Sequence, residues 1–201
     1  DPALYEYHGI SACSSVIKTS LTDLARSLGV NAQKGANSMV YNQGTPVINA
    51  LFNVKYIIGN NKRVAQDSHL DFVAESNGST LYENKYPLSL GFMVKDSVYD
   101  YDVNGSSQRA VAQENLINLA TGLDITLFKE IDSPEVSASN MTATYYGNGR
   151  ITCSAPTNSK QPSTVSLEYV SDKDQDIYFG VTATGLNSIV ISIGDGDEVR
   201  Y

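Results

Sequence analysis

The sequence has few basic side chains, and this shortage excludes whole classes of partner. Only 14 Lys and Arg oppose 22 Asp and Glu, which gives a formal net charge of −8. The basic residues are scattered, whereas binding to nucleic acid requires clusters of them to neutralise phosphates. We therefore exclude nucleic acid as a partner. The same shortage argues against a domain held on anionic lipid by its charge.

The sequence is also poor in cysteine and has no tryptophan. Cys13 and Cys153 are far apart, and no Cys-x-x-Cys pair exists, which argues against a structural zinc site. We interpret both as buried free thiols, with a bridge between them as the open alternative. No cofactor and no metal ion are expected.

Long hydrophobic runs and a signal peptide are missing as well, since no segment approaches the about 18 apolar residues that span a bilayer. The strand-like run 189–193 is followed by a Gly-Asp-Gly-Asp turn, and the sequence stops where another strand would begin. We interpret the chain as a soluble piece of a larger cell-surface protein.

Residues 1–123 mix helix and strand signals. Thr19-Ser20 is an N-cap signal before an apolar stripe that ends at Gly29, and Thr45-Pro46 begins a second helix over 47–52. A third helix is expected over 109–120, closed by Gly122. The strands expected in this region are a buried one at 54–58 and two more at 79–83 and 89–94.

Residues 124–201 have the sequence pattern of an all-β region. Short alternating runs are separated by polar turns, which favours a small antiparallel β-sandwich or a barrel-like arrangement. We therefore predict an α+β protein with two domains, 1–123 and 124–201. The expected strands of the second domain are 125–131, 141–146, 150–153, 164–170, 177–182 and 188–193.

The sequence carries no recognisable catalytic set. Gly-x-Ser-x-Gly is absent, and the only imidazoles are His8 and His69. His69 stands between Asp67 and Asp71, where a general base with a carboxylate orienter is one interpretation. We favour an exposed loop histidine. His8 follows Tyr7, which suits either a packed histidine or a ligand contact.

Two acidic turns resemble calcium loops only in part. Residues 172–176 read Asp-Lys-Asp-Gln-Asp, but Ile177 stands where the sharp turn needs glycine and Ala183 where a glutamate is needed. Residues 195–197 form a typical two-strand turn. Paired carboxylates for glycoside hydrolysis stay open, because their spacing is spatial. The candidates are Glu75, Glu83, Glu114 and Glu168.

The most specific signal is the order of several phrases along the chain. Tyr-Glu-Tyr-His-Gly at 5–9 is followed by Asn-Val-Lys-Tyr-Ile-Ile at 53–58, Tyr-Glu-Asn at 82–84 and Pro-Leu-Ser-Leu-Gly-Phe at 87–92. This succession resembles the external region of the YfhO family of bacterial multi-pass membrane proteins, over residues 1 to about 125. Two local departures are Tyr86, where the family usually has leucine, and Glu114, which splits the family's Gln-Asn pair.

The resemblance implies a parent protein with a GT-C type glycosyltransferase architecture. Such proteins decorate lipoteichoic acid with a sugar taken from a polyprenyl-phosphate carrier, at the extracytoplasmic face of the cell membrane. Their catalytic acid belongs to an early external loop that this chain does not contain, so no catalytic residue is carried over. The implied partners are the parent's own transmembrane helices and teichoic acid or a polyprenyl-linked sugar.

Two classes of function follow. In the first, the chain is a support or acceptor-binding module, with Tyr5, Tyr7 and His8 as candidate sugar contacts, because a tyrosine ring can stack on a sugar face. The alternative for the tyrosines, which we favour, is half-buried packing. Lys55, Lys62, Arg63 and Lys85 are the candidates for a basic patch that binds a phosphate polymer, and a domain that only shapes and covers the membrane site is the open alternative. The alternatives are an independent secreted glycosidase, a carbohydrate-binding module, or an adhesin-like sandwich with an exposed apolar patch.

Overall fold

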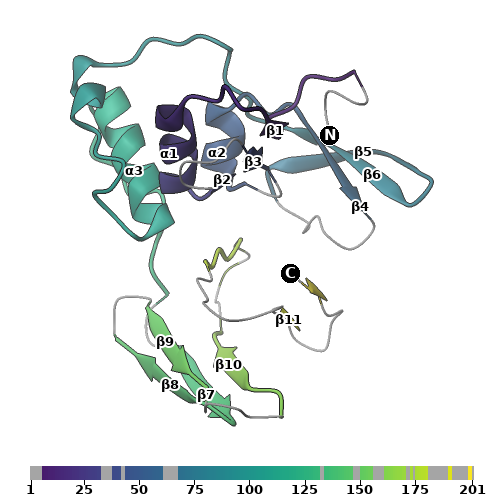
Figure 1. Ribbon diagram of the computed structural model, residues 1–201, viewed down its shortest axis with the longest axis vertical. Helices are drawn as coiled ribbons and strands as arrows, with labels where there is room; N and C mark the ends of the chain where they lie inside the picture. The colour runs from purple at the N-terminus through teal and green to yellow at the C-terminus, as the bar shows by residue number, and fades with distance from the viewer. Residues whose placement is uncertain are drawn as a thin grey trace. The chain divides into compact units, whose positions relative to one another are not determined.

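The chain divides into two compact units, residues 1–125 together with 176–201, and residues 126–175. Figure 1 shows the computed structural model. The structure describes residues 6–32, 38–41, 44–60, 68–131, 134–146, 150–155, 161–170, 173, 175–180, 190–191 and 199–200.

Among its described residues, the first unit contains three α-helices grouped beside one another (Figure 1). They are α1 (Thr19–Ser27), α2 (Pro46–Leu51) and α3 (Arg109–Thr121), and the short 3₁₀ helix η1 (Asp96–Asp100) precedes α3. All three α-helices were predicted from local signals in the sequence.

The helix ends follow those signals in most places. The hydroxyl of Thr45 caps α2 by accepting a hydrogen bond from the Ile48 amide at 3.3 Å. Gly122 ends α3 in the left-handed conformation, with φ +68°. The predicted N-cap of α1 is wrong, because Lys18 holds that position without a side-chain bond and Thr19 already lies within the helix.

A three-stranded antiparallel sheet extends from the helices, in the order β4–β6–β5 (Figure 1). Its strands are β4 (Tyr56–Asn60), β5 (Leu70–Ser76) and β6 (Ser79–Asn84). Asn77 and Gly78 join β5 to β6 with φ of 49° and 76°, as a tight hairpin turn requires. The sequence predicted β4 and β6 and missed β5, whose mixed acidic and apolar residues carry no strict alternation.

A second, smaller sheet has the order β1–β3–β2. Its strands are β1 (Ala12–Cys13), β2 (Asn31–Ala32) and β3 (Ser38–Val40), all paired antiparallel. The main hydrophobic core lies between this sheet and the helices. It contains Ala25, Leu28, Val30, Ala32, Met39 and Ile48. Burying each large apolar side chain in it contributes about 1.5–3 kcal/mol.

Two predictions about apolar runs in this unit are wrong. The strand β4 is covered on one face only, because successive side chains point to opposite sides: Ile57 is buried and Ile58 is exposed. Residues 89–94 form no strand. Their segment finds no pairing strand, and its flanking amides bind instead to helix carbonyls, from Leu88 to Ala50 and from Lys95 to Ala120.

The second unit consists of two-stranded antiparallel pairs. The strand β7 (Glu135–Ser139) pairs with β10 (Thr164–Glu168), and β8 (Thr142–Tyr145) pairs with β9 (Ile151–Ser154). None of the described residues between 126 and 175 is buried. The predicted strand at 125–131 is irregular backbone. The sheets are open, and no barrel closes among the residues that the structure describes.

The α+β class is confirmed. The last part of the chain contributes one short antiparallel pair, β11 (Val190–Ile191) with β12 (Val199–Arg200). Residues 177–180 of the predicted strand 177–182 are irregular, and the remainder of that run lies outside the described residues, as do most of 188–193 and the acidic turn 195–197. Of the acidic turn 172–176, only residues 173, 175 and 176 are described. Cys13 and Cys153 are free and exposed, so the predicted burial of the two thiols is wrong.

Candidate functional site

A cavity of about 460 Å³ lies between η1, the loop that follows it, and α3. One wall comes from η1 and its loop, with Ser97, Asp100, Tyr101 and Asp102. The other wall comes from α3 and the residues after it, with Ala112, Asn115, Asn118, Leu119, Gly122 and Leu123. The cavity lining is about equally polar and apolar.

Hydrogen bonds fix the wall that η1 forms. The Ser97 hydroxyl donates to the Leu119 carbonyl at 2.6 Å, which ties η1 to the last turn of α3. The Tyr101 hydroxyl lies 3.0 Å from the Ser27 hydroxyl, which ties the loop to α1. Because both contacts join elements far apart in sequence, the cavity depends on the tertiary fold.

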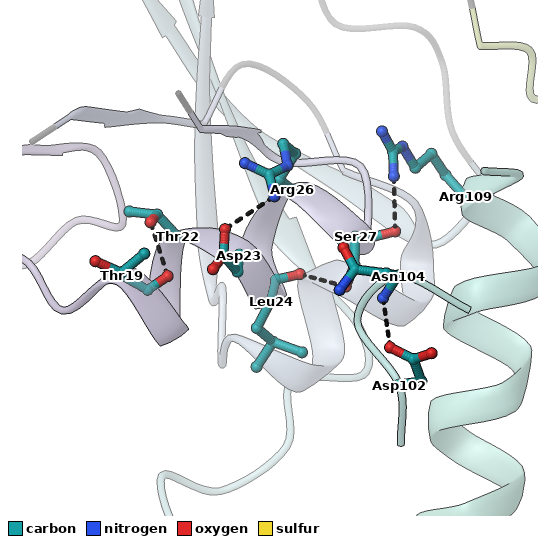
Figure 2. A network of polar contacts seen from close by, with 9 residues as sticks. All are labelled: Thr19, Thr22, Asp23, Leu24, Arg26, Ser27, Asp102, Asn104 and Arg109. Carbon is teal, nitrogen blue, oxygen red and sulfur yellow. Dashed lines mark hydrogen bonds and ion pairs between the residues drawn. The ribbon is translucent and has the colours of Figure 1, made fainter. Parts of the chain in front are cut away.

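The neighbouring loop is shaped by a carboxylate. An oxygen of Asp102 accepts a hydrogen bond from the Asn104 amide at 2.9 Å, as Figure 2 shows. Nearby, the Arg109 guanidinium donates to the Ser27 carbonyl at 3.5 Å and links the start of α3 to the end of α1. Asp102 is therefore held in a defined position at the cavity wall.

The chain that leaves α3 also lines the cavity, with Gly122 and Leu123. The Asn118 amide donates to the Ile125 carbonyl at 3.0 Å and accepts from the Ile125 amide at 3.1 Å, which holds this chain in place. Lys95 lies across Gly122: a β-carbon on that glycine would stand only 2.7 Å from the lysine Nζ. A cation is favourable there, because the final carbonyls of a helix carry partial negative charge.

Two polar groups of the cavity remain available to a ligand. Asp100 and Asn115 are exposed, and neither side chain has a hydrogen-bond partner among the residues that the structure describes. A carboxylate accepts and an amide both donates and accepts, which matches the hydroxyl groups of a neutral polar ligand. The acids Asp100 and Asp102 disfavour a polyanion in the same place.

The residues singled out from the sequence do not line this cavity. Tyr7 and His8 are exposed in the segment before β1, and Tyr5 lies outside the described residues. Lys55 directly precedes β4, and Lys85 directly follows β6. Their contact with a ligand stays a prediction.

The two lysines carry acidic neighbours. Lys55 Nζ lies 4.0 Å from a Glu83 oxygen and 5.1 Å from the centre of the Tyr56 ring. Lys85 Nζ lies 3.1 Å from an Asp71 oxygen and donates to the Ser68 carbonyl at 3.0 Å. These pairs offset much of the positive charge that a phosphate polymer would need. Lys62 and Arg63, predicted for the same patch, lie outside the described residues.

The prediction of an exposed His69 is wrong. Its side chain is 4% exposed, and its Nε2 lies 2.9 Å from the amide nitrogen of Asn49, which is also buried. A general base has to reach its substrate, and this imidazole is sealed from solvent. The neighbouring Asp71 pairs with Lys85, while Asp67 lies outside the described residues. His69 thus joins α2 to the β4–β6–β5 sheet as a structural residue.

The sequence interpretation missed the cavity acids. The motif Asp100-Tyr-Asp102, which alternates acidic and aromatic side chains at the end of η1, was the available signal. Within the described residues, no group of three or more His, Cys, Asp or Glu side chains is placed to hold a metal ion.

The fold and the cavity define a mixed α+β protein with an open site that polar and apolar groups line together. No helix in the described part of the chain is long and apolar enough to cross a bilayer. A family model described as "Bacterial membrane protein YfhO" matches residues 1–193, and the chain belongs to this family of bacterial membrane proteins. The match confirms the resemblance and reaches well beyond residue 125. No curated protein and no solved structure matches the chain.

Proposed function

We propose that the chain is the extracytoplasmic, non-catalytic support or acceptor-binding domain of a membrane glycosyltransferase. In this proposal the parent protein decorates lipoteichoic acid with a sugar from a polyprenyl-phosphate carrier. The observation that carries the proposal is the family match over residues 1–193. The partners are the parent's own transmembrane helices and the carrier or acceptor.

The cavity between η1 and α3 supports the acceptor-binding half of the proposal. Its available groups are the Asp100 carboxylate and the Asn115 amide, beside the ring of Tyr101. Small ligand sites commonly combine an apolar or aromatic surface with a few polar groups that fix orientation. A sugar offers hydroxyls to the polar groups and an apolar face to the ring.

The charges of the cavity favour the sugar over the phosphates of the polymer. Asp100 and Asp102 contribute two carboxylates, and the net charge of the chain is −8. A phosphodiester at the same place would be repelled. The ligand proposed for the cavity is therefore the neutral glycosyl group, with the phosphate of the carrier outside it.

A titration of the chain with three ligands tests this proposal. The ligands are a polyprenyl-phosphate sugar, the free sugar and a lipoteichoic acid fragment. Binding is measured by the heat released in calorimetry or by changes in NMR chemical shifts. Asp100→Asn and Asn115→Ala are expected to weaken binding of the sugar-bearing ligands by about tenfold each, since each removes one ligand hydrogen bond. Glu168→Gln in the second unit is the matched control.

Two results would count against the proposal in different ways. Absence of binding to every ligand would remove the acceptor-binding half and leave a support role. Release of sugar from the polymer by the purified chain would contradict a non-catalytic domain and favour the secreted glycosidase.

A further inference from the structure

The segment 86–94 presents an uncharged, mostly apolar surface to solvent. It carries Leu90 and Met93 at 92% and 97% exposure, among the most exposed large apolar side chains of the described residues. Tyr86, Leu88, Phe92 and Val94 of the same segment are exposed as well. Such a continuous apolar surface on a folded domain marks a contact with a protein or a membrane.

The exposure of this segment is built into the fold. The Tyr86 amide donates to the Asn84 side chain at 3.1 Å where the segment begins, and the Leu88 amide donates to the Ala50 carbonyl at 3.2 Å. At the other end, the Lys95 amide donates to the Ala120 carbonyl at 2.8 Å. These bonds hold the segment to α2 and α3 while its apolar side chains face outward.

The middle of the segment stands away from the rest of the molecule. A β-carbon on Gly91 would have no other atom within 4 Å. Leu90 and Met93, on either side of it, are almost fully exposed. The surface is therefore convex, and it has flexible apolar side chains where a rigid protein partner would require a groove. A fluid apolar phase accommodates such a surface without a matching shape.

We infer that segment 86–94 docks on a lipid bilayer, with its apolar side chains at the boundary between headgroups and acyl chains. Lys85 and Lys95 bound the uncharged segment in sequence, and the alkyl stem of a lysine can lie along an apolar surface while its charge stays in water. Tyr86 and Phe92 are aromatic residues of the kind enriched at membrane interfaces. The irregular backbone stays at headgroup depth, where water satisfies its polar groups.

Apolar contact, and not net charge, drives this docking. The net charge of −8 disfavours anionic lipid, and Lys85 is paired with Asp71. Binding is thus expected on zwitterionic phosphatidylcholine vesicles and is not expected to require an anionic lipid.

Docking would also place the cavity close to the membrane. The segment runs directly into η1, and the Lys95 side chain crosses Gly122 at the cavity wall. A ligand carried on a lipid would therefore be presented near Asp100 and Asp102. The docking inference goes beyond the proposed function and holds whichever ligand the cavity accepts.

The first test is flotation of the whole chain with vesicles of phosphatidylcholine, with and without phosphatidylglycerol. The double variant Leu90→Asp with Met93→Asp is expected to reduce the bound fraction by about tenfold or more, because two apolar contacts are lost. The matched control adds the same two charges at other highly exposed apolar positions, Val16→Asp with Val170→Asp. The control is expected to bind as the unmodified chain does.

The second test uses tryptophan fluorescence. An introduced tryptophan is the only source of this emission, because the chain has no tryptophan of its own. Leu90→Trp is expected to shift its emission to shorter wavelength on vesicles and to be quenched by brominated lipid. Val16→Trp, at another exposed site, is expected to stay unquenched. This test holds even if the charged double variant folds poorly.

Three results would overturn the inference. They are no flotation of the unmodified chain on either vesicle, equal flotation of the Leu90 and Met93 double variant, or quenching of both tryptophans alike. Self-association without lipid that the same double variant abolishes would assign the surface to a second copy and also overturn it. Sugar titration of the double variant separates this inference from the proposed function, since cavity binding should be unchanged.

Discussion

The Asn49 amide nitrogen lies 2.9 Å from His69 Nε2, and both side chains are buried. Asn49 also accepts a hydrogen bond from the Tyr41 hydroxyl and donates to the Gly44 carbonyl at 3.4 Å. The Asn49 side chain thus links α2 to the loop before it and to His69, which directly precedes β5. Buried polar groups that share one partner lose their bonds together when that partner is removed.

Substitution of Asn49 is the first prediction. Asn49→Leu would leave the Tyr41 hydroxyl and the His69 imidazole without this partner, and we expect the free energy of unfolding to fall by about 2–4 kcal/mol. Urea unfolding followed by circular dichroism measures it. The matched control is Asn115→Leu at an exposed position, expected within about 0.5 kcal/mol of the unmodified chain. Equal effects of the two variants would contradict a structural role for the network.

The hydrophobic core supplies the second prediction. Leu28 is 1% exposed and Leu90 is 92% exposed, so the same Leu→Ala change is made in opposite surroundings. We expect Leu28→Ala to lower the free energy of unfolding by about 2–5 kcal/mol through lost burial and a cavity. Leu90→Ala should leave it within about 0.5 kcal/mol. A large loss from Leu90→Ala would mean that the segment 86–94 packs within the domain.

The left-handed glycine at the end of α3 supplies the third prediction. Gly122 has φ +68°, and an added β-carbon would collide with the Lys95 side chain. We expect Gly122→Ala to lower the free energy of unfolding by about 1 kcal/mol or more, from the strained backbone and the displaced lysine. Gly180→Ala is the control, since no atom lies within 4 Å of its β-carbon position. A neutral Gly122→Ala would contradict the left-handed backbone conformation at this position, since the lysine tip can move aside at little cost.

The exposed thiols supply the fourth prediction. Cys13 and Cys153 are free and exposed, so both should react with a thiol reagent in the folded chain at the rate of a small-molecule thiol. The absorbance of the released chromophore gives the number of reactive thiols per chain. The Cys13→Ser and Cys153→Ser variants should each release half as much chromophore as the unmodified chain. Reaction that begins only in denaturant would show that the thiols are protected or joined.

The helices could be predicted because their signals are local. Thr45 with Pro46 and the glycines 29 and 122 act on backbone within one turn of their own position. The strands were harder, because a run such as 89–94 becomes a strand only if another strand accepts its hydrogen bonds. β5 formed against β6 in spite of its mixed composition, through the tight turn at Asn77 and Gly78.

The candidate site could not be predicted from the sequence. The bond from Ser97 to the Leu119 carbonyl holds η1 against α3, and the bond between Tyr101 and Ser27 holds the following loop against α1. The site residues predicted from the sequence were Tyr5, Tyr7, His8, Lys55 and Lys85, and none of them is among the residues that line the cavity. A general base at His69 was the less favoured interpretation, and in the fold that imidazole lies beside Asn49.

The sequence by itself determined the α+β class, the three helices with most of their ends, and the family, because these rest on short-range backbone preferences and on the order of phrases along the chain. The tertiary structure alone decided that His69 is buried, that Asp100 and Asp102 border a cavity, and that segment 86–94 stays exposed. Burial and exposure depend on contacts between residues far apart in the chain, and spacing in sequence does not specify those contacts.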